Sequence, residues 1–333
     1  MATIDTQHHA PTVAEARVRW WTPAIKARET GLIVIILALF TVMSLISPYF
    51  LTVDNLRAMA MAFAVESIVV VGMTILLISG GIDLSVGSVT ALAMVVAGWL
   101  FLNGVDPWAA AALAILATTC IGMAMGFLTT VVGLHHFIVS LGVMVIARGV
   151  CLLATGGRPL SLFSLPPEFK FIGQGSVYGV PLVLIIFVVV VVAFDLMLRR
   201  TTAFRKVFYV GSNPKTAAYS GIRVGRVVFA TTTLCSMLCG VAGVIYMARF
   251  GSAQPSFGVG MELNVIAAAV IGGASLSGGS GTILGAILGA VLLSVVSSSL
   301  ALLNVSVYWQ DIIRGSILLA AVLFDHYLVK RRR

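Results

Sequence analysis

About ten apolar windows, most of them close to 20 residues long, follow one another along the chain and limit its possible folds more than any other feature. A helix needs about 20 mostly apolar residues to cross the hydrocarbon core of a bilayer. Inside lipid, only helices and closed barrels satisfy every backbone polar group. We therefore predict an all-α integral membrane protein with about ten transmembrane helices. The windows cover residues 31–46, 58–79, 86–102, 107–131, 137–154, 180–198, 227–249, 263–273, 282–302 and 309–328.

The composition leaves little room for a second kind of domain beside these windows. Of 333 residues, 59% are hydrophobic and 10% are charged, whereas soluble domains carry about 25% charged residues. No polar block is long enough to fold separately. We predict one polytopic domain over residues 31–328, preceded by a segment over residues 1–30 and followed by a basic tail over residues 329–333.

Positive charge gathers in three clusters that flank apolar windows, so the net charge of +9 does not indicate a nucleic-acid surface. Lys and Arg are enriched in the cytoplasmic loops of membrane proteins. If the N-terminus is cytoplasmic, six windows return the second cluster to that side and ten return the third. We expect a multi-pass protein of the cell inner (plasma) membrane with both termini cytoplasmic. The clusters are Arg17, Arg19, Lys26 and Arg28; Arg199, Arg200, Arg205, Lys206, Lys215, Arg223 and Arg226; and Lys330, Arg331, Arg332 and Arg333.

One glycine-rich motif occurs twice. Residues 80–90 read GGIDLSVGSVT and residues 272–282 read GGASLSGGSGT, with seven of eleven positions identical at an offset of 192 residues. Gly-interrupted segments at corresponding positions of two halves point to a transport site near the membrane midplane, although small residues also mediate ordinary tight helix packing. The predicted helix-break glycines are Gly80, Gly81, Gly87, Gly272, Gly273 and Gly279.

Polar residues near the two motifs are candidates for a translocation pathway. A carboxylate inside the membrane is a functional candidate by default, but Asp83 also has the sequence position of a helix cap. An interfacial turn and a helix start explain the polar residues before the second motif equally well. The candidates are Asp83, Ser85, Gln254, Glu262, Asn264 and Ser277.

The sequence predicts neither a catalytic site nor a metal site. His135 and His136 are adjacent and have no third ligand nearby, and the glycine-rich motifs lack the Lys of a phosphate-binding loop. We expect Arg148 and Arg314 to snorkel or to pair with an acid such as Asp311. Residues 156–179 form a Pro- and Gly-rich external loop, which is either a docking surface or a connector.

Four segments together resemble the ribose-type permease family of ATP-binding-cassette importers. They read GMTILLISGGIDLSVGSV over residues 72–89, RKVFYVGSNPKTAAYSGI over residues 205–222, SAQPSFGVGMELNVIAAAVIGGASLSGGSGTILGAILGA over residues 252–290 and VYWQDIIRGSILLAAVLFD over residues 307–325. The resemblance covers about residues 30–328. The chain departs from the family pattern in having Arg205-Lys206 in place of Gly-Arg, and Gly211-Ser212-Asn213 in place of Gly-Gly-Asn.

The resemblance implies a permease that pairs with a second copy, binds two ATPase subunits and receives a sugar from a periplasmic binding protein. It implies that the ATPase subunits use ATP with Mg and that this chain binds no cofactor itself. A coupling loop would lie within about residues 199–226, although its basic, acid-free sequence also suits adhesion to anionic lipid. The alternatives are an ion-coupled secondary transporter and a membrane-embedded enzyme, which require more intramembrane acids or converging catalytic groups. The resemblance assigns ATPase coupling to Arg205, Asn213, Ala217, Ala218 and Gly221.

Overall fold

The computed structural model describes residues 23–331, and a helix occupies each of the ten predicted windows. The prediction of an all-α membrane protein is confirmed. Of the predicted basic residues, Arg17, Arg19, Arg332 and Arg333 lie outside the described part. The helices are α1 (Pro23–Ile46), α2 (Val53–Ile78), α3 (Val86–Leu102), α4 (Pro107–Thr130), α5 (His136–Thr155), α6 (Pro167–Gln174), α7 (Leu182–Arg200), α8 (Thr202–Ser212), α9 (Pro214–Tyr219), α10 (Val224–Phe250), α11 (Met261–Ile271), α12 (Ile283–Leu302) and α13 (Val307–Arg331).

Seven helices of the described residues are long and apolar enough to cross a membrane. They are α1, α2, α4, α5, α7, α10 and α12. The shorter apolar helices are α3 and α11. The prediction that residues 263–273 form a complete span is wrong, because α11 has only 11 residues and extends about 16 Å, roughly half of the hydrocarbon core.

The helices form a central group and an outer layer. The second halves of α2 and α10 are almost entirely buried, whereas α1, α4, α5 and α7 present many large apolar side chains at the surface. Leu45 on α1 and Leu153 on α5 are more than four-fifths exposed, at 82% and 86%. An apolar surface of this extent requires lipid or another apolar partner.

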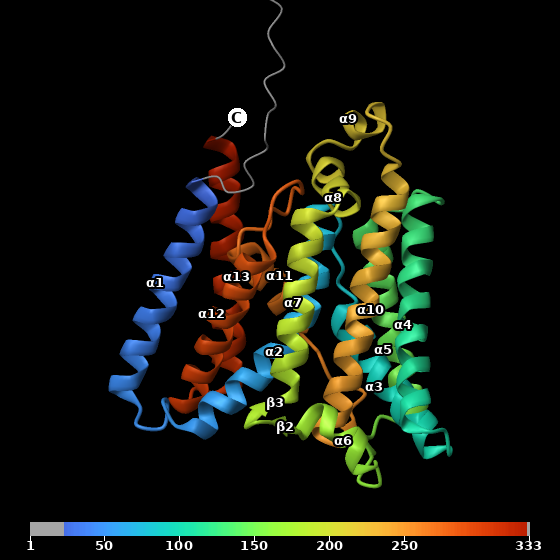
Figure 1. The fold of residues 1–333 in the computed structure, drawn as a ribbon, viewed down its shortest axis with the longest axis vertical. Helices are drawn as coiled ribbons and strands as arrows, with labels where there is room; N and C mark the ends of the chain where they lie inside the picture. The colour runs from blue at the N-terminus through green and yellow to red at the C-terminus, as the bar shows by residue number, and fades with distance from the viewer. Residues whose placement is uncertain (1–22, 332–333) are drawn as a thin grey trace, which may run out of the picture.

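The two ends of the molecule differ in character. At one end lie α8, α9, the start of α1 and the end of α13 (Figure 1). This end carries the basic stretch over residues 199–226 and is called the basic end. At the opposite end, called the loop end, residues 156–181 include α6 and the hairpin of β2 (Ser176–Val177) and β3 (Val180–Pro181).

A second short strand pair joins the loop over residues 156–179 to the segment before α11. β1 (Leu160–Ser161) pairs antiparallel with β4 (Ser252–Ala253), and the register places Leu160 opposite Ala253. The neighbouring helix α6 packs on the end of α10, where the side-chain amide of Gln174 donates to the carbonyl oxygens of Ala248 and Arg249. The loop over residues 156–179 is therefore attached at two places, to β4 and to the end of α10.

Candidate functional site

Both glycine motifs begin by ending a helix in the same way. After α2, Gly80 adopts a φ of 89° and the amide of Gly81 bonds to the carbonyl of Leu76, five residues back. After α11, Gly273 adopts a φ of 106° and Ala274 bonds to Ala269. This geometry satisfies the last carbonyls of a helix and favours glycine at the left-handed position. The repeated sequence thus marks two equivalent helix ends, with the left-handed glycine displaced by one residue in the second copy.

The first motif then continues into the protein interior. Asp83 and Ser85 are fully buried. One carboxylate oxygen of Asp83 accepts hydrogen bonds from the backbone amide of Ser85 at 2.7 Å and from its hydroxyl at 2.6 Å. This contact shapes the turn that leads into α3 but is not a cap on the helix, whose N-cap residue is Ser85. The second carboxylate oxygen is buried with no hydrogen-bond partner among the described residues.

Side chains from two other helices hold this extended segment. The carbonyl oxygen of Ile82 lies 2.8 Å from Nδ1 of His136 and 3.4 Å from the hydroxyl of Ser140, both on α5. The other ring nitrogen of His136 lies 2.9 Å from the hydroxyl of Thr232 on α10. A buried carbonyl needs such a partner where the helical bonding pattern is interrupted. His136 therefore positions the segment, a role that the sequence did not indicate.

The N-terminal ends of α3 and α11 meet in the interior. A Cβ atom on Gly87 would collide with the carbonyl of Gly258 and would lie 2.9 Å from a carboxylate oxygen of Glu262. A Cβ atom on Gly258 would lie 2.8 Å from the carbonyl of Gly87. Only glycine permits the two backbones to approach this closely.

From this meeting point the two short helices run to opposite ends of the molecule. Gly98 of α3 packs beside Leu162 and Ala253 at the loop end. The last carbonyls of α11, those of Val270 and Ile271, accept hydrogen bonds from Arg28 at the start of α1, at the basic end. Each helix begins inside the protein, and a helix N-terminus carries a partial positive charge. Broken helices with this arrangement form the substrate sites of many transporters.

A cavity of about 460 Å³ opens beside this meeting point. Ser88 of α3, Arg148 of α5 and Glu262 of α11 are among its lining residues. The guanidinium of Arg148 donates to the carbonyls of Pro255 and Phe257, at 2.6 and 2.7 Å. It therefore fixes the turn before α11, a role different from the predicted snorkelling or pairing with an acid.

A second, smaller cavity of about 170 Å³ lies among α2, α11, α12 and α13. Glu66, Asn264, Ser297 and Arg314 line it. Arg314 also forms the expected ion pair with Asp311, at 3.4 Å. A carboxylate, an amide, a hydroxyl and a guanidinium supply both donors and acceptors, so this cavity is suited to a ligand rich in hydroxyl groups. The candidates predicted from the sequence include Asn264 but not Glu66, although Glu66 is an acid inside the apolar window 58–79.

The second glycine motif remains at the basic end, where it contacts the first motif and α8. The amide of Gly279 donates to the carbonyl of Ile78, the last residue of α2, at 2.8 Å. A Cβ atom on Gly278 would lie 2.8 Å from the carbonyl of Gly211 and 3.1 Å from Cα of Gly80. Gly87 therefore lies in the interior where α3 begins, whereas Gly80, Gly278 and Gly279 meet beneath α8 at the basic end.

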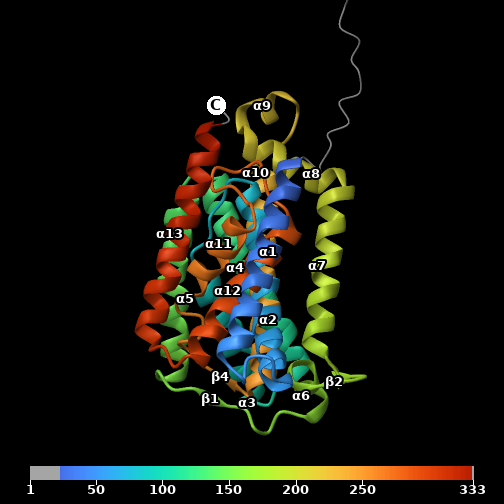
Figure 2. The ribbon, with the colours of Figure 1, turned by 90° about the vertical axis from the view of Figure 1, so that its left-hand side faces the viewer.

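The predicted coupling loop folds into two short helices that project from the basic end (Figures 1 and 2). Asn213 accepts hydrogen bonds from the amides of Lys215 and Thr216 and so caps α9. Ala217 is buried, Ala218 is exposed, and Gly221 has a φ of 80° after the end of the helix. These residues build a compact turn.

The remaining pathway candidates do not gather at one place. Gln254 is exposed in the segment after β4, and Ser277 is exposed in the second motif at the basic end. Glu262 reaches the meeting point of α3 and α11, and Asn264 lines the smaller cavity. Asp83, Ser85 and Glu262 lie where α3 and α11 begin, around Gly87 and Gly258, which is called the broken-helix region. Gln254 and Ser277 lie outside this region.

Comparisons with known proteins show the family to which the chain belongs. Residues 55–322 match the family described as branched-chain amino acid transport system / permease component. The chain is 37% identical over 310 residues to the ribose import permease protein RbsC of Escherichia coli strain K12, an alignment that covers 92% of this chain and 96% of the relative. It is 33% identical over 321 residues to the L-arabinose ABC transporter permease protein AraH of Azospirillum brasilense, covering 96% and 94% of the two chains.

A further relative is named for a third sugar, D-allose. The D-allose transport system permease protein AlsC of Escherichia coli strain K12 is 33% identical over 300 residues, covering 90% of this chain and 91% of the relative. No solved structure matches the chain. The chain therefore belongs to this family of transport permeases, and the predicted resemblance to its ribose-type members is confirmed.

Proposed function

We propose that this protein is the transmembrane permease subunit of an ATP-binding-cassette importer, and that it moves a monosaccharide or a related polyol into the cytoplasm. The names of the relatives, which refer to ribose, D-allose and L-arabinose, support a sugar as the substrate. In this proposal a separate ATPase subunit binds and hydrolyses ATP with Mg. The permease supplies the pathway and the coupling and has no catalytic residue of its own.

The contact between α8 and the two glycine motifs is the observation that carries the proposal. A Cβ atom on Gly211, near the end of α8, would collide with the carbonyl of Ile78 and would lie 2.5 Å from the amide nitrogen of Gly279. Any movement of α8 is therefore passed by direct backbone contact to the end of α2. The extended segment that follows α2 leads to Asp83 and the start of α3. A displacement of α8 at the basic end is therefore transmitted to the broken-helix region.

The interior start of α3 and α11 is the proposed substrate pathway. The two cavities on either side of α11 offer carboxylate, guanidinium, amide and hydroxyl groups. Such mixed donors and acceptors suit a neutral polyhydroxylated solute, which must exchange its hydrogen bonds with water for hydrogen bonds with protein. Asp83 and Ser85 are proposed to shape the turn into the pathway, and Glu262 to face it.

The proposed orientation places the basic end in the cytoplasm of a cell whose inner membrane holds the protein, in keeping with the excess of Lys and Arg there. α8 and α9 then face the ATPase subunit, and Arg205, Asn213, Ala217, Ala218 and Gly221 belong to the proposed contact. The loop end faces the periplasm, where α6 and the β2–β3 hairpin offer a surface for a sugar-binding protein. A second copy of the permease is proposed to complete the channel.

Uptake of labelled sugars into proteoliposomes tests this proposal. The vesicles would contain the permease, its ATPase subunit and its binding protein, and uptake would be measured with and without ATP. We expect ATP-dependent uptake of one sugar class that disappears when any one component is omitted. Uptake by the permease alone, driven by an ion gradient, would overturn the proposal in favour of an ion-coupled secondary transporter.

The coupling contact can be tested in the same vesicles. We expect Gly211→Ala to leave the complex assembled but to reduce sugar uptake per ATP hydrolysed at least fivefold, because the added methyl group separates α8 from α2. Gly142→Ala on α5 is the matched control, since a Cβ atom there meets no other atom within 4 Å. An unchanged ratio of transport to hydrolysis in Gly211→Ala would contradict the coupling route.

A further inference from the structure

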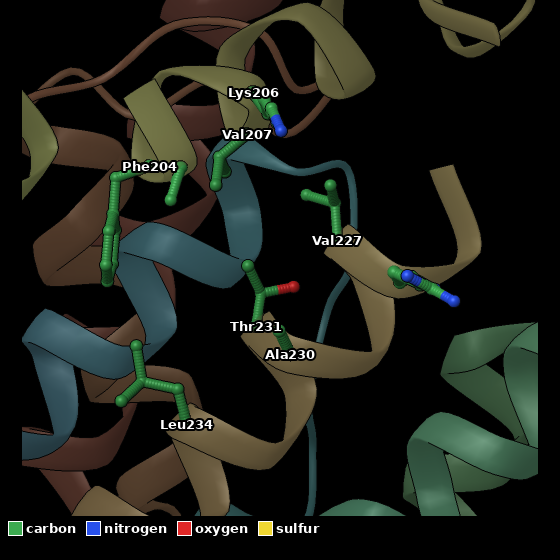
Figure 3. Close-up of a pocket in the computed structure, with 9 residues that line it drawn as sticks. Phe204, Lys206, Val207, Val227, Ala230, Thr231 and Leu234 are labelled. Carbon is green, nitrogen blue, oxygen red and sulfur yellow. The ribbon is translucent and has the colours of Figure 1, made fainter. Parts of the chain in front are cut away.

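A pocket of about 240 Å³ lies between α8 and α10 at the basic end, away from the broken-helix region. Figure 3 shows Phe204 and Val207 of α8 on one side and Val227, Ala230 and Leu234 of α10 on the other. These side chains are apolar. The proposed pathway does not use this pocket.

The lining changes from charged to apolar with depth along α10. Arg226 lines the pocket near the start of the helix, and Leu234 lines it eight residues later. Eight residues correspond to about 12 Å along the helix axis. α10 is one of the helices able to cross a membrane, so in a bilayer that placed Arg226 at the interface the apolar floor would lie within the hydrocarbon core. This depth favours a lipid chain over a side chain of a water-soluble partner.

The rim has the charge that an anionic head group requires. Lys206 and Arg226 line the pocket and are exposed, and within the described residues neither of them forms an ion pair. Residues 199–226 contain seven Lys and Arg residues and no Asp or Glu. Basic pockets between transmembrane helices are suited to anionic lipid head groups. The combination of a basic rim and an apolar floor therefore matches both halves of one amphipathic molecule.

We propose that this pocket binds one anionic phospholipid, with an acyl chain between Phe204 and Leu234 and the phosphate near Lys206 and Arg226. The lipid would contact α8 directly, above the glycine motifs. At the floor of the pocket, the hydroxyl of Thr231 lies 3.1 Å from that of Ser79, the residue that follows α2. Bound lipid would thus stabilise α8 against the helices beneath it. The proposal does not depend on which solute the protein transports.

Native mass spectrometry of the full-length protein, delipidated in detergent, tests the binding. The probe is palmitoyl-oleoyl phosphatidylglycerol, compared with the zwitterionic phosphatidylcholine that carries the same chains. We expect one phosphatidylglycerol to be retained at least fivefold more tightly than phosphatidylcholine. The double variant Lys206→Gln/Arg226→Gln should remove this preference, whereas Lys215→Gln/Arg223→Gln, which removes equal charge from the same stretch outside the pocket, should preserve it.

A second variant tests the apolar half of the site. Ala230→Phe fills the pocket and should lower retention of both lipids, whereas Ala112→Phe, at an exposed position on α4, should not. The proposal would be overturned if the two lipids bound equally, or if both charge variants lost the preference for phosphatidylglycerol to the same extent. Either result would mean that lipid is attracted non-specifically to the basic end. Loss of ATPase binding in Ala230→Phe with unchanged lipid retention would overturn it too, because the pocket would then be a subunit contact.

Discussion

The two glycine motifs share seven of eleven residues but lead the chain to different places. Each ends a helix with a left-handed glycine. Within the first motif, the chain continues inward to the buried carboxylate of Asp83 and begins α3. The second motif instead turns back beneath α8, and α12 begins directly after it at the basic end. The local sequence that ends a helix does not determine where the chain goes next.

Two substitutions between the motifs account for the difference. Val86 and Val89 of the first motif correspond to Gly278 and Gly281 of the second at the same offset. Gly278 and Gly281 have φ values of 81° and 155°, which a β-branched residue does not readily adopt. The valines can begin α3 at residue 86, whereas the glycines permit further turns before Thr282 caps α12.

The largest effect is expected where the second motif is made to resemble the first. Gly278→Val introduces a side chain at a positive φ and against the carbonyl of Gly211. We expect a loss of about 3 kcal/mol or more, from backbone strain together with the collision, measured as the apparent melting temperature in detergent. Gly142→Val on α5 is the control, because its Cβ position is open. Equal stability of the two variants would show that the second motif tolerates a helical start.

Asp83 and Ser275 occupy the same position in the two motifs and provide the next test. Asp83→Ala leaves the buried amide and hydroxyl of Ser85 without their acceptor, and we expect a loss of about 2 kcal/mol. Ser275→Ala removes only a 3.2 Å bond from the amide of Ser277, and should lose about 1 kcal/mol at most. Asp83→Asn, which retains an acceptor, should recover stability. If Asp83→Ala were as stable as Ser275→Ala, the carboxylate would not be what shapes the first motif.

Two adjacent histidines test how the extended part of the first motif is held. His136→Ala removes the contacts to Ile82 and Thr232, and we expect a loss of about 1.5 kcal/mol with reduced uptake in proteoliposomes. The neighbouring His135 is exposed, so His135→Ala should resemble the unmodified protein in both measurements. Equal effects of the two substitutions would argue against a positioning role for His136.

The smallest expected difference separates a second equivalent pair, Ser85 and Ser277. Ser85→Ala removes a buried 2.6 Å bond to Asp83 and should lower stability by about 1 kcal/mol. Ser277 is exposed, and Ser277→Ala should stay within about 0.5 kcal/mol of the unmodified protein. Melting temperatures of the two variants, recorded side by side, decide the point. A larger loss in Ser277→Ala would place the second motif in a tighter environment than its exposure indicates.

The sequence predicts the helices of this fold but only part of the candidate site. Apolar windows predict helices because lipid allows little else. They do not reveal that the helix predicted over residues 263–273 starts inside the protein. A helix that crosses half of the membrane and a short helix that crosses all of it have similar hydropathy. The meeting of Gly87 with Gly258 joins residues far apart in the chain, and Gly258 carries no signal of its own. Likewise, the functions of His136 and Arg148 depend on which carbonyls the fold brings beside them.

The pairing of β1 with β4 has a mechanical consequence. The loop over residues 156–179 and the segment that leads to α11 share one small ladder, with Leu160 opposite Ala253. A displacement of the loop can reach α11 only through residues 254–260. Gly258 and Gly260, which both have positive φ, can absorb the displacement by backbone rotation. If they do not rotate, the first turn of α11 moves with the loop. The short helix α11 is thus held at both ends, by the β1–β4 ladder at the loop end and by Arg28 at the basic end. The two glycines determine how much of a displacement at the loop end reaches it.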